Sequence, residues 1–229
     1  ALITEWGAGV FLSSSTTYDM SNNTISNNEL SGNYYGIWIL NAQKNVVASN
    51  NVLNNVITGI YLSASSWNHI EANTLTGHDD SGIWLYSSDG CTVEFNVASG
   101  NFNGIYLESS ENNVLQRNDL NGNNYGIYLY DSSYNSMLFN ECNDSVIDGI
   151  YLEYANDNLI ANNNCCGNNA GRGIFLFCSS LNTLQNNTCS GNSEGISLYS
   201  RTDAFSTENA IHNNTCNGNT NDGIKVQAS

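Results

Sequence analysis

Apolar and outward-facing positions alternate in a short phrase that recurs along the chain. The phrase is glycine, an apolar residue, an outward residue and a second apolar residue. It begins at Gly9, Gly36, Gly59, Gly82, Gly104, Gly126, Gly149, Gly173, Gly195 and Gly223. Most intervals are 22 to 24 residues, and the two longer ones lie at the two ends. A repeat of this length is typical of a solenoid, in which each repeat is one coil.

The repeat that begins at Gly104 indicates what one coil contains. Ile105 and Leu107 alternate with outward side chains, which predicts a short strand with one buried face. Two further segments follow, and their apolar residues are Leu115 and Leu120. Nothing repeats at the 3.6-residue spacing of an amphipathic helix. Three short strands and three turns therefore predict a triangular coil, and stacked coils predict apolar columns that form one continuous core.

Asparagine accounts for 42 of the 229 residues, and its positions follow the same period. One column runs through Asn28, Asn50, Asn73, Asn96, Asn118, Asn140, Asn163, Asn187 and Asn214. A second runs through Asn23, Asn45, Asn68, Asn113, Asn135, Asn158, Asn182 and Asn209, with Cys91 at one coil. At corners, asparagine tolerates left-handed backbone, and stacked amides can bond to one another. We expect both columns to be structural ladders.

The repeat Gly-Ile-x-Leu-x-x-Ser-x-x-Asn-x-Ile-x-x-Asn-x-Leu-x-x-Asn resembles that of NosD-like right-handed parallel β-helix proteins, over residues 9–226. The resemblance implies an all-β fold: a right-handed parallel β-helix of about nine coils of 22–24 residues, with three short strands per coil. Residues 1–229 are expected to form one domain. Similar repeats occur in pectate-lyase-like enzymes, in a copper-handling periplasmic protein and in archaeal surface proteins. The acidic, Asn- and Cys-bearing composition is most similar to methanogen cell-envelope or sheath proteins.

Charge narrows the expected partners and location. Acidic residues outnumber basic ones 21 to 5, which gives a net charge of −16. This balance disfavours nucleic acid and anionic membrane surfaces as partners. No apolar run approaches the length of a membrane span. The chain begins at Ala1 rather than Met, and it has seven cysteines. We expect a secreted, extracellular or cell-surface protein whose signal peptide has been removed.

The sequence gives weak support for chemistry. Glu108 and Glu153 share an outward position two coils apart, roughly 9–10 Å at the spacing of strands in a sheet. This is near the carboxyl separation of inverting glycosidases. Carboxylates of this kind are more often solvated surface groups, so we expect no catalytic residue and no enzymatic activity. His69, His78 and His212 lie in different coils with no Cys or His at ligand spacing, so no metal site and no cofactor is expected.

The cysteines have two possible structural roles. Cys142, Cys165, Cys189 and Cys216 occupy an inward position on four consecutive coils. They can be small apolar fillers of the core. They can also form disulfides along the axis, such as Cys142–Cys165 and Cys189–Cys216, because the spacing of coils lies within the range for a disulfide. Cys166 should point outward and is a candidate for an intermolecular cross-link.

One outward position is aromatic on eight consecutive coils. These residues are Phe11, Trp38, Tyr61, Trp84, Tyr106, Tyr128, Tyr151 and Phe175. Such a row spans roughly 34 Å at about 4.8 Å per coil. The rings could stack only on one another, or form a platform on which sugars stack. They could also pack laterally against another subunit, which we favour because exposed apolar patches of this size normally mark interfaces.

Neither end of the repeat carries a charged or helical capping segment, which predicts axial stacking of copies. The rival explanation is that the chain was cut from a longer protein. The favoured hypothesis is therefore a structural protein whose partner is itself, assembling into a sheath, layer or filament. The alternative is a polysaccharide-binding or polysaccharide-cleaving protein that uses the aromatic row together with Glu108 and Glu153, with glycans as its partners.

Overall fold

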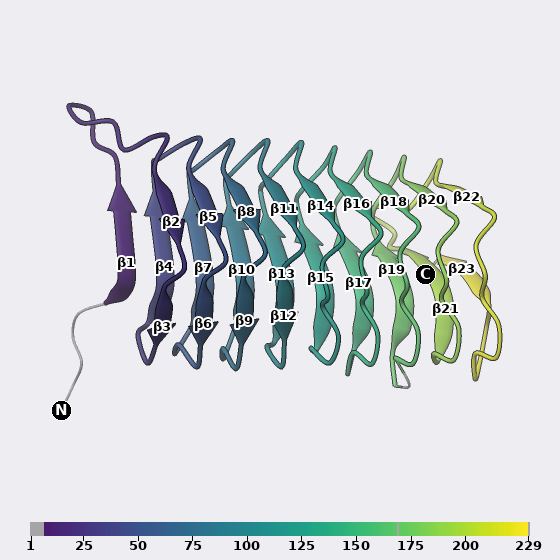
Figure 1. The fold of residues 1–229 in the computed structure, drawn as a ribbon. Coiled ribbons are helices and arrows are strands. Elements are labelled where there is room, and N and C mark those ends of the chain that lie inside the picture. Colours follow the sequence, from purple (N-terminus) through teal and green to yellow (C-terminus); the bar gives the residue numbers. More distant parts are fainter. Residues whose placement is uncertain (1–6, 169, 229) are drawn as a thin grey trace.

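The chain forms a right-handed β-solenoid (Figure 1), which confirms the predicted fold class. The computed structural model describes residues 7–168 and 170–228. Its coils follow one another along a single axis from the purple to the yellow end of Figure 1. The described residues contain strands and turns but no α-helix, so they include no helix that could cross a membrane.

Ten strands form the longest parallel sheet, sheet A. They are β1 (Ala8–Ser13), β4 (Tyr35–Leu40), β7 (Thr58–Ser63), β10 (Ser81–Tyr86), β13 (Asn103–Glu108), β15 (Tyr125–Tyr130), β17 (Asp148–Glu153), β19 (Arg172–Phe177), β21 (Glu194–Ser200) and β23 (Ile224–Ala228). Each of these strands contains all or part of the repeated phrase that begins with glycine. Because matching positions of successive phrases pair in register, the sequence period becomes a spatial period.

Two further sheets complete each coil. Sheet B contains β2 (Thr24–Ser26), β5 (Val46–Ala48), β8 (His69–Glu71), β11 (Thr92–Glu94), β14 (Val114–Gln116), β16 (Ser136–Leu138), β18 (Leu159–Ala161), β20 (Thr183–Gln185) and β22 (Ala210–His212). Sheet C contains β3 (Glu29–Ser31), β6 (Asn51–Leu53), β9 (Thr74–Thr76) and β12 (Val97–Ser99). Each strand of these sheets spans three residues, which suits the tight triangular coil.

Sheet C shortens to single bridges after β12, although the sequence predicts three strands in every coil. The first of these bridges joins Val97 to Asp119. In the coils after this bridge, main-chain N–H groups that would extend the strand pairing donate to side chains instead. The N–H of Asn143 donates to Oδ1 of Asn121 at 2.7 Å, and the N–H of Cys166 donates to Oδ1 of Asn143 at 2.8 Å. Side-chain acceptors therefore replace the main-chain carbonyls of a regular strand.

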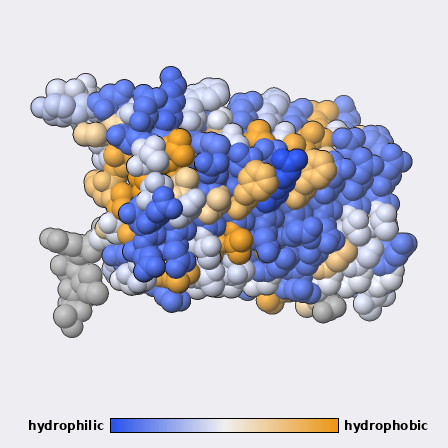
Figure 2. Space-filling model, in the orientation of Figure 1, coloured by the Kyte–Doolittle hydropathy of each residue, from blue (hydrophilic) through white to orange (hydrophobic). Residues whose placement is uncertain are grey.

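The predicted apolar columns form one continuous core. Inward residues such as Ile37, Leu107 and Ile196 are fully buried. The last strand differs, because the side chain of Val226 is 70% exposed among the described residues. The predicted axial stacking of copies at such ends stays a prediction. In the orientation of Figure 1, the space-filling surface is largely hydrophilic, with apolar side chains in separate spots (Figure 2).

The asparagine columns are hydrogen-bonded ladders, as the sequence predicts. The N–H of Asn118 donates to Oδ1 of Asn140 at 3.1 Å, and its Nδ2 donates to the carbonyl of Val93 at 2.9 Å. The buried amide of Asn118 therefore bonds to groups of the coils on both sides of it. The left-handed backbone falls on the residue before each ladder position, for example Arg117 at φ 53°, and not on the ladder asparagine as expected.

A third ladder runs beside sheet C, and the sequence analysis did not predict it as a separate column. It has two bonded stretches, Asn33, Asn55, His78, Asn101 and Asn123, and then Ser145, Asn168, Asn192 and Asn219. Between them the side-chain oxygen of Ser145 is buried without a hydrogen-bond partner. His78 replaces asparagine in this ladder, and its Nδ1 accepts the N–H of Asn55 at 3.2 Å. Its Nε2 is buried without a well-formed hydrogen bond. Burial lowers the pKa of His78, so the ring stays neutral in the fold.

We expect His78→Asn to stabilise the protein by about 1 kcal/mol at pH 7, because the asparagine oxygen can accept the N–H of Asn55 in place of Nδ1 and the substitution removes the buried unsatisfied Nε2. The wild type should also lose stability as the pH falls below about 6.5, since the unfolded chain binds the proton more readily than the fold does. Thermal unfolding at pH 7.5 and 5.5 checks both points. The exposed His212→Asn is the matched control, and equal pH dependence of wild type and His78→Asn would contradict the second point.

Candidate functional site

All eight predicted aromatic residues lie in register on the outer face of sheet A. We call them the aromatic row: Phe11, Trp38, Tyr61, Trp84, Tyr106, Tyr128, Tyr151 and Phe175. The alternation of the glycine phrase places them there, since the residues on either side point into the core. Most of the rings are half-buried, whereas Phe11 is 54% exposed and Phe175 is buried.

The rings of the aromatic row stack on one another. Neighbouring ring centroids lie 4.8 to 6.0 Å apart. From Tyr106 to Phe175 the angles between ring planes are 28°, 19° and 9°. The rings therefore cover much of one another's faces and present their edges to the outside. The rings thus stack within the chain, and lateral packing against another subunit stays a prediction. A sugar would cross ring edges in this segment rather than lie flat on ring faces.

Two carboxylates flank the row at the next outward position. Glu108 pairs in register with Tyr130, and Tyr130 pairs with Glu153, so the two carboxylates lie two coils apart. The phenol of Tyr128 donates to Oε2 of Glu153 at 2.5 Å. The sequence did not predict this bond, because it joins side chains of two adjacent coils at different positions.

The phenols beside these carboxylates stay protonated. Burial raises the pKa of Tyr106, and the charge of Glu108 and a hydrogen bond to it raise it further. Burial also raises the pKa of Tyr128 and of Tyr151, and in both cases Glu153 adds to the rise. These three phenols can therefore donate hydrogen bonds to a ligand or to a carboxylate, but they cannot serve as bases near neutral pH.

The cationic side chains of this face are already paired. Arg172 donates through Nε to Oδ1 of Asp148 at 2.8 Å and through Nη2 to Oδ2 at 3.0 Å, and its guanidinium lies 3.5 Å from the ring centroid of Phe175. Lys225 donates to Glu194 at 2.6 Å. Burial raises the pKa of Asp148, and the Arg172 guanidinium opposes that rise. Among the described residues, no ion pair joins Glu108 or Glu153 to a cation.

A hollow opens beside this ion-paired end of sheet A. It is lined by Val146, Ile147, Ala170, Gly171, Arg172, Ser193 and Glu194. The hollow lies at the start of β19 and β21, next to the Asp148–Arg172 pair. Asp80 lies at the same edge of the sheet, before β10, and accepts hydrogen bonds from Ser81 and Asn103 at 3.1 and 3.2 Å. Burial raises the pKa of Asp80.

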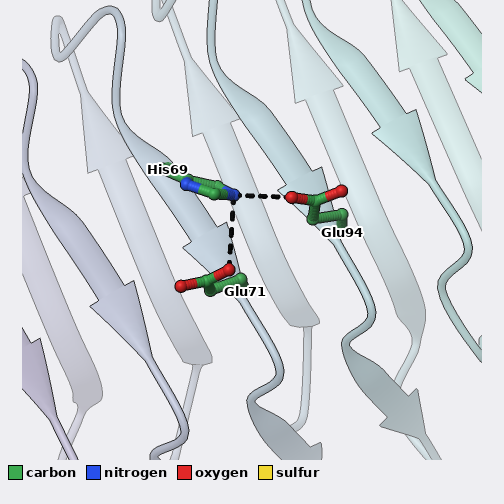
Figure 3. A group of neighbouring side chains, drawn as sticks. All are labelled: His69, Glu71 and Glu94. Atoms are coloured by element: carbon green, nitrogen blue, oxygen red, sulfur yellow. Dashed lines mark hydrogen bonds and ion pairs between the residues drawn. The ribbon is translucent and has the colours of Figure 1, made fainter.

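A separate cluster lies on sheet B, where His69 meets two carboxylates (Figure 3). Nε2 of His69 lies 2.9 Å from Oε1 of Glu94 and 3.7 Å from Oε2 of Glu71. The prediction of no metal ligands considered only Cys and His as further ligands beside each histidine, so it did not include these carboxylates. The signal was the i, i+2 pair His69 and Glu71, with Glu94 at the matching position of the next coil. His78 and His212 are not part of the cluster.

The cysteine column is present, and all seven cysteines are free thiols in the structure. Cys142, Cys165 and Cys189 are fully buried, and Cys216 is partly buried. Burial raises the pKa of Cys165, and a hydrogen bond with the Cys165 thiol raises that of Cys189. Disulfides in this column stay a prediction, as does a cross-link through Cys166, whose thiol is partly exposed.

We expect Cys166 to react before Cys142, Cys165 and Cys189 with a thiol reagent in the native protein, because its thiol is partly exposed and those three are fully buried. Alkylation before and after unfolding, followed by peptide mass spectrometry, measures this. Cys142, Cys165 and Cys189 should be labelled only after unfolding. Failure to label them in unfolded, unreduced protein would instead demonstrate the disulfides, and native labelling of Cys165 would contradict the expectation.

Comparison with known proteins gives two family matches. The model described as a right handed beta helix region matches residues 58–210, and the model described as periplasmic copper-binding protein (NosD) matches residues 2–101. No curated protein matches the chain.

Several solved structures share the fold at low identity. A variant of the periplasmic alginate epimerase AlgG is similar with a TM-score of 0.82 and 19% identity, covering 93% of this chain and 56% of that one. The A-module of mannuronan C-5 epimerase AlgE6 from Azotobacter vinelandii gives 0.71 and 15%, covering 91% and 65%. DFA-IIIase from Arthrobacter chlorophenolicus in complex with GF2 gives 0.67 and 13%, covering 90% and 60%. In each case the chain spans less than two thirds of the other protein.

These similarities correct one expectation. The chain was expected not to be an enzyme, whereas the solved structures named above, the two epimerases and DFA-IIIase, share its fold and are enzymes. The expectation relied on the lack of catalytic signatures in the sequence. On a solenoid, catalytic groups come from separate coils and need not form a local motif. The favoured sheath or filament role gains no support from these similarities, which agree better with the polysaccharide alternative.

Proposed function

We propose that this chain, which belongs to the right-handed β-helix family, binds a polysaccharide along sheet A. In this proposal, Glu108 and Glu153 hydrolyse the bound polysaccharide. The observation that carries the proposal is the aromatic row with carboxylates beside it on one continuous face. The row runs parallel to the solenoid axis and spans roughly 34 Å. A linear polymer that lies along this axis would meet the same kind of side chain at every coil.

The binding mode follows from the ring geometry. The edges of aromatic rings carry partial positive charge, so they suit the hydroxyl oxygens of a sugar. The phenols of Tyr106, Tyr128 and Tyr151 add hydrogen-bond donors at the centre of the row, since they stay protonated. The glycan would therefore be held by many weak contacts, of which no single one is decisive.

The charge of the face indicates the substrate class. Arg172 and Lys225 are paired with their own carboxylates, so they are not available to neutralise an acidic sugar. The whole chain carries a net charge of −16. Like charges repel a polyuronate, whereas a neutral or amino-substituted glycan avoids this cost. We therefore assign the face to a neutral or amino polysaccharide, unlike the alginate in the names of its structural relatives.

The two carboxylates have the spacing for inversion. At about 4.8 Å per coil they lie roughly 9–10 Å apart, close to the separation that admits an attacking water. The phenol of Tyr128 donates to Glu153 and holds its carboxylate in place, and we assign Glu153 the base that takes a proton from water. Glu108 would donate a proton to the glycosidic oxygen as the bond to the anomeric carbon breaks. The water oxygen then forms the new bond, and the two products separate.

The proposed place of action is outside the cytoplasm, in the envelope or the extracellular space. Both the NosD description and the name of the alginate epimerase include the word periplasmic. Polysaccharides are abundant in these compartments, which agrees with the proposed substrate.

Affinity electrophoresis through gels that contain a neutral glucan, glycol chitosan or alginate tests the binding proposal. We expect retardation in the first or second gel and none in alginate. Tyr106→Ala combined with Tyr128→Ala should abolish the retardation, whereas Tyr134→Ala, an exposed ring before β16 of sheet B, should not. No retardation in any gel, together with fibres or sheets in electron micrographs, would overturn the proposal and support self-assembly instead.

A further inference from the structure

We infer that His69, Glu71 and Glu94 bind one divalent transition-metal ion on the outer face of sheet B. The three candidate ligand atoms all lie within 4.8 Å of one another. The imidazole and the two carboxylates point toward a common centre (Figure 3). This cluster is distinct from the carbohydrate face on sheet A, and the inference does not depend on the proposed function.

The solenoid holds the three ligands on a rigid frame. His69 and Glu71 belong to β8 and lie on either side of the fully buried Ile70, so both point outward. Glu94 of β11 pairs in register with Glu71. The ligands therefore come from the regular ladder of two adjacent strands rather than from mobile turns, and a site built on strands keeps its geometry before the metal arrives.

The distances suit a metal with short bonds. Tetrahedral zinc with bonds of about 2.1 Å places its ligand atoms about 3.4 Å apart. Nε2 of His69 lies 2.9 Å from Oε1 of Glu94 and 3.7 Å from Oε2 of Glu71, on either side of that value. Small side-chain rotations would bring each atom to its bonding distance. Three protein ligands would leave a position for water.

The charges of the cluster are unbalanced without a cation. Glu71 and Glu94 lie directly opposite each other on neighbouring strands, an arrangement in which like charges repel. Among the described residues, ion pairs with Lys or Arg join Arg172 to Asp148, Arg201 to Asp203 and Lys225 to Glu194. None of these cations reaches Glu71 or Glu94. The imidazole supplies at most one positive charge, whereas a divalent ion would neutralise both carboxylates.

A neighbouring amide orients one of the ligands. Nε2 of Gln116, on the next strand β14, donates to Oε2 of Glu94 at 2.7 Å. This bond leaves Oε1 of Glu94 directed at His69. Hydrogen-bonded carboxylates of this kind are usual around metal ligands, because they fix the orientation of the donor atom. Gln116 is therefore a positioning residue for the site.

The donor set selects among metals. One imidazole nitrogen and two carboxylate oxygens suit Zn²⁺, Co²⁺, Ni²⁺ or Cu²⁺, whereas Mg²⁺ and Ca²⁺ prefer oxygen ligands throughout. A bound ion would link β8 to β11 and so join two coils. Metal binding should therefore raise the unfolding temperature of the whole solenoid, by about 5–10 °C when the free ion is at a hundred times its dissociation constant.

Isothermal titration with ZnCl₂ tests the inference on the full chain without a histidine tag. Cys166→Ser serves as the background, because the exposed thiol could also bind zinc. We expect one Zn²⁺ per chain, with no competition from an equal concentration of Mg²⁺ or Ca²⁺. His69→Ala and Glu94→Gln should each weaken binding more than tenfold, and Gln116→Ala about tenfold. The exposed His212→Ala should bind as the background does.

The same variants are then heated with and without Zn²⁺. The rise in unfolding temperature should disappear in His69→Ala and Glu94→Gln and persist in His212→Ala. Circular dichroism checks that each variant keeps its fold. The absence of saturable binding would overturn the inference and reduce the cluster to an ion pair. Binding that persists unchanged in both His69→Ala and Glu94→Gln would overturn it as well, because the ion would then lie elsewhere.

Discussion

Glu153→Gln is expected to lower the rate of polysaccharide hydrolysis by on the order of 10³-fold while leaving binding nearly unchanged. Glutamine keeps an oxygen that can accept the phenol of Tyr128 at the position of Oε2. It cannot take a proton from water, so the catalytic step is lost and the contacts of the aromatic row remain. Glu108→Gln should have a comparable effect, because the leaving oxygen would then lack its proton donor.

The measurement is the release of new reducing ends from whichever polysaccharide the affinity gels retain, with the anomer of the product identified by NMR. Glu111→Gln, an exposed glutamate in the turn after β13, is the matched control and should hydrolyse at the wild-type rate. Inversion at the anomeric carbon is expected from the two-coil spacing. Full activity in both Glu153→Gln and Glu108→Gln would contradict the assignment of these residues while leaving glycan binding intact.

Asn118→Ala is expected to destabilise the fold by about 3–5 kcal/mol, since it leaves two or more buried polar groups without partners at about 1–3 kcal/mol each. Oδ1 of Asn118 accepts the main-chain N–H and the Nδ2 of Asn96, at 3.0 and 3.1 Å. Its own Nδ2 donates to the carbonyl of Val93 at 2.9 Å and to Oδ1 of Asn140 at 3.0 Å. Alanine removes all four bonds in the middle of the solenoid, where water cannot replace them.

Urea unfolding followed by tryptophan fluorescence measures the loss. Asn51→Ala is the control, because Asn51 is an exposed strand residue outside the ladders, and it should change stability by no more than about 0.5 kcal/mol. A similar small effect for Asn118→Ala would show that the ladder bonds merely replace bonds to water. In that case the apolar columns alone would account for the stability of the coils.

Most of the fold could be predicted from the sequence, because a solenoid repeats its local pattern. The spacing of Ile105 and Leu107 in one coil already defines which side chains point inward, and the period carries that assignment to every other coil. The asparagine columns could be predicted for the same reason. Sheet C beyond β12 could not be predicted, since side-chain bonds from residues such as Asn121 and Asn143 compete with the strand ladder only once the coils are stacked.

The candidate sites could also be predicted only in part from the sequence. The row that contains Tyr128 and the position of Glu153 followed from periodicity, but the bond between them did not, because it joins side chains of adjacent coils at different positions. The pairing of Arg172 with Asp148 also depends on the distance between two coils, and it leaves this guanidinium unavailable to an acidic sugar. The expectation of a non-enzymatic protein was corrected by the enzymes that share the fold, which no residue pattern revealed.

The sequence by itself determined the solenoid, its core and the face on which the aromatic side chains lie, because these depend only on which residues recur at a fixed interval. Only the tertiary structure decided how far the rings cover one another, which charges are neutralised and that His69 meets Glu71 and Glu94. These depend on side-chain directions and on distances of a few ångströms between coils. The period shows which residues lie on neighbouring coils, but it does not show which of their side-chain atoms meet.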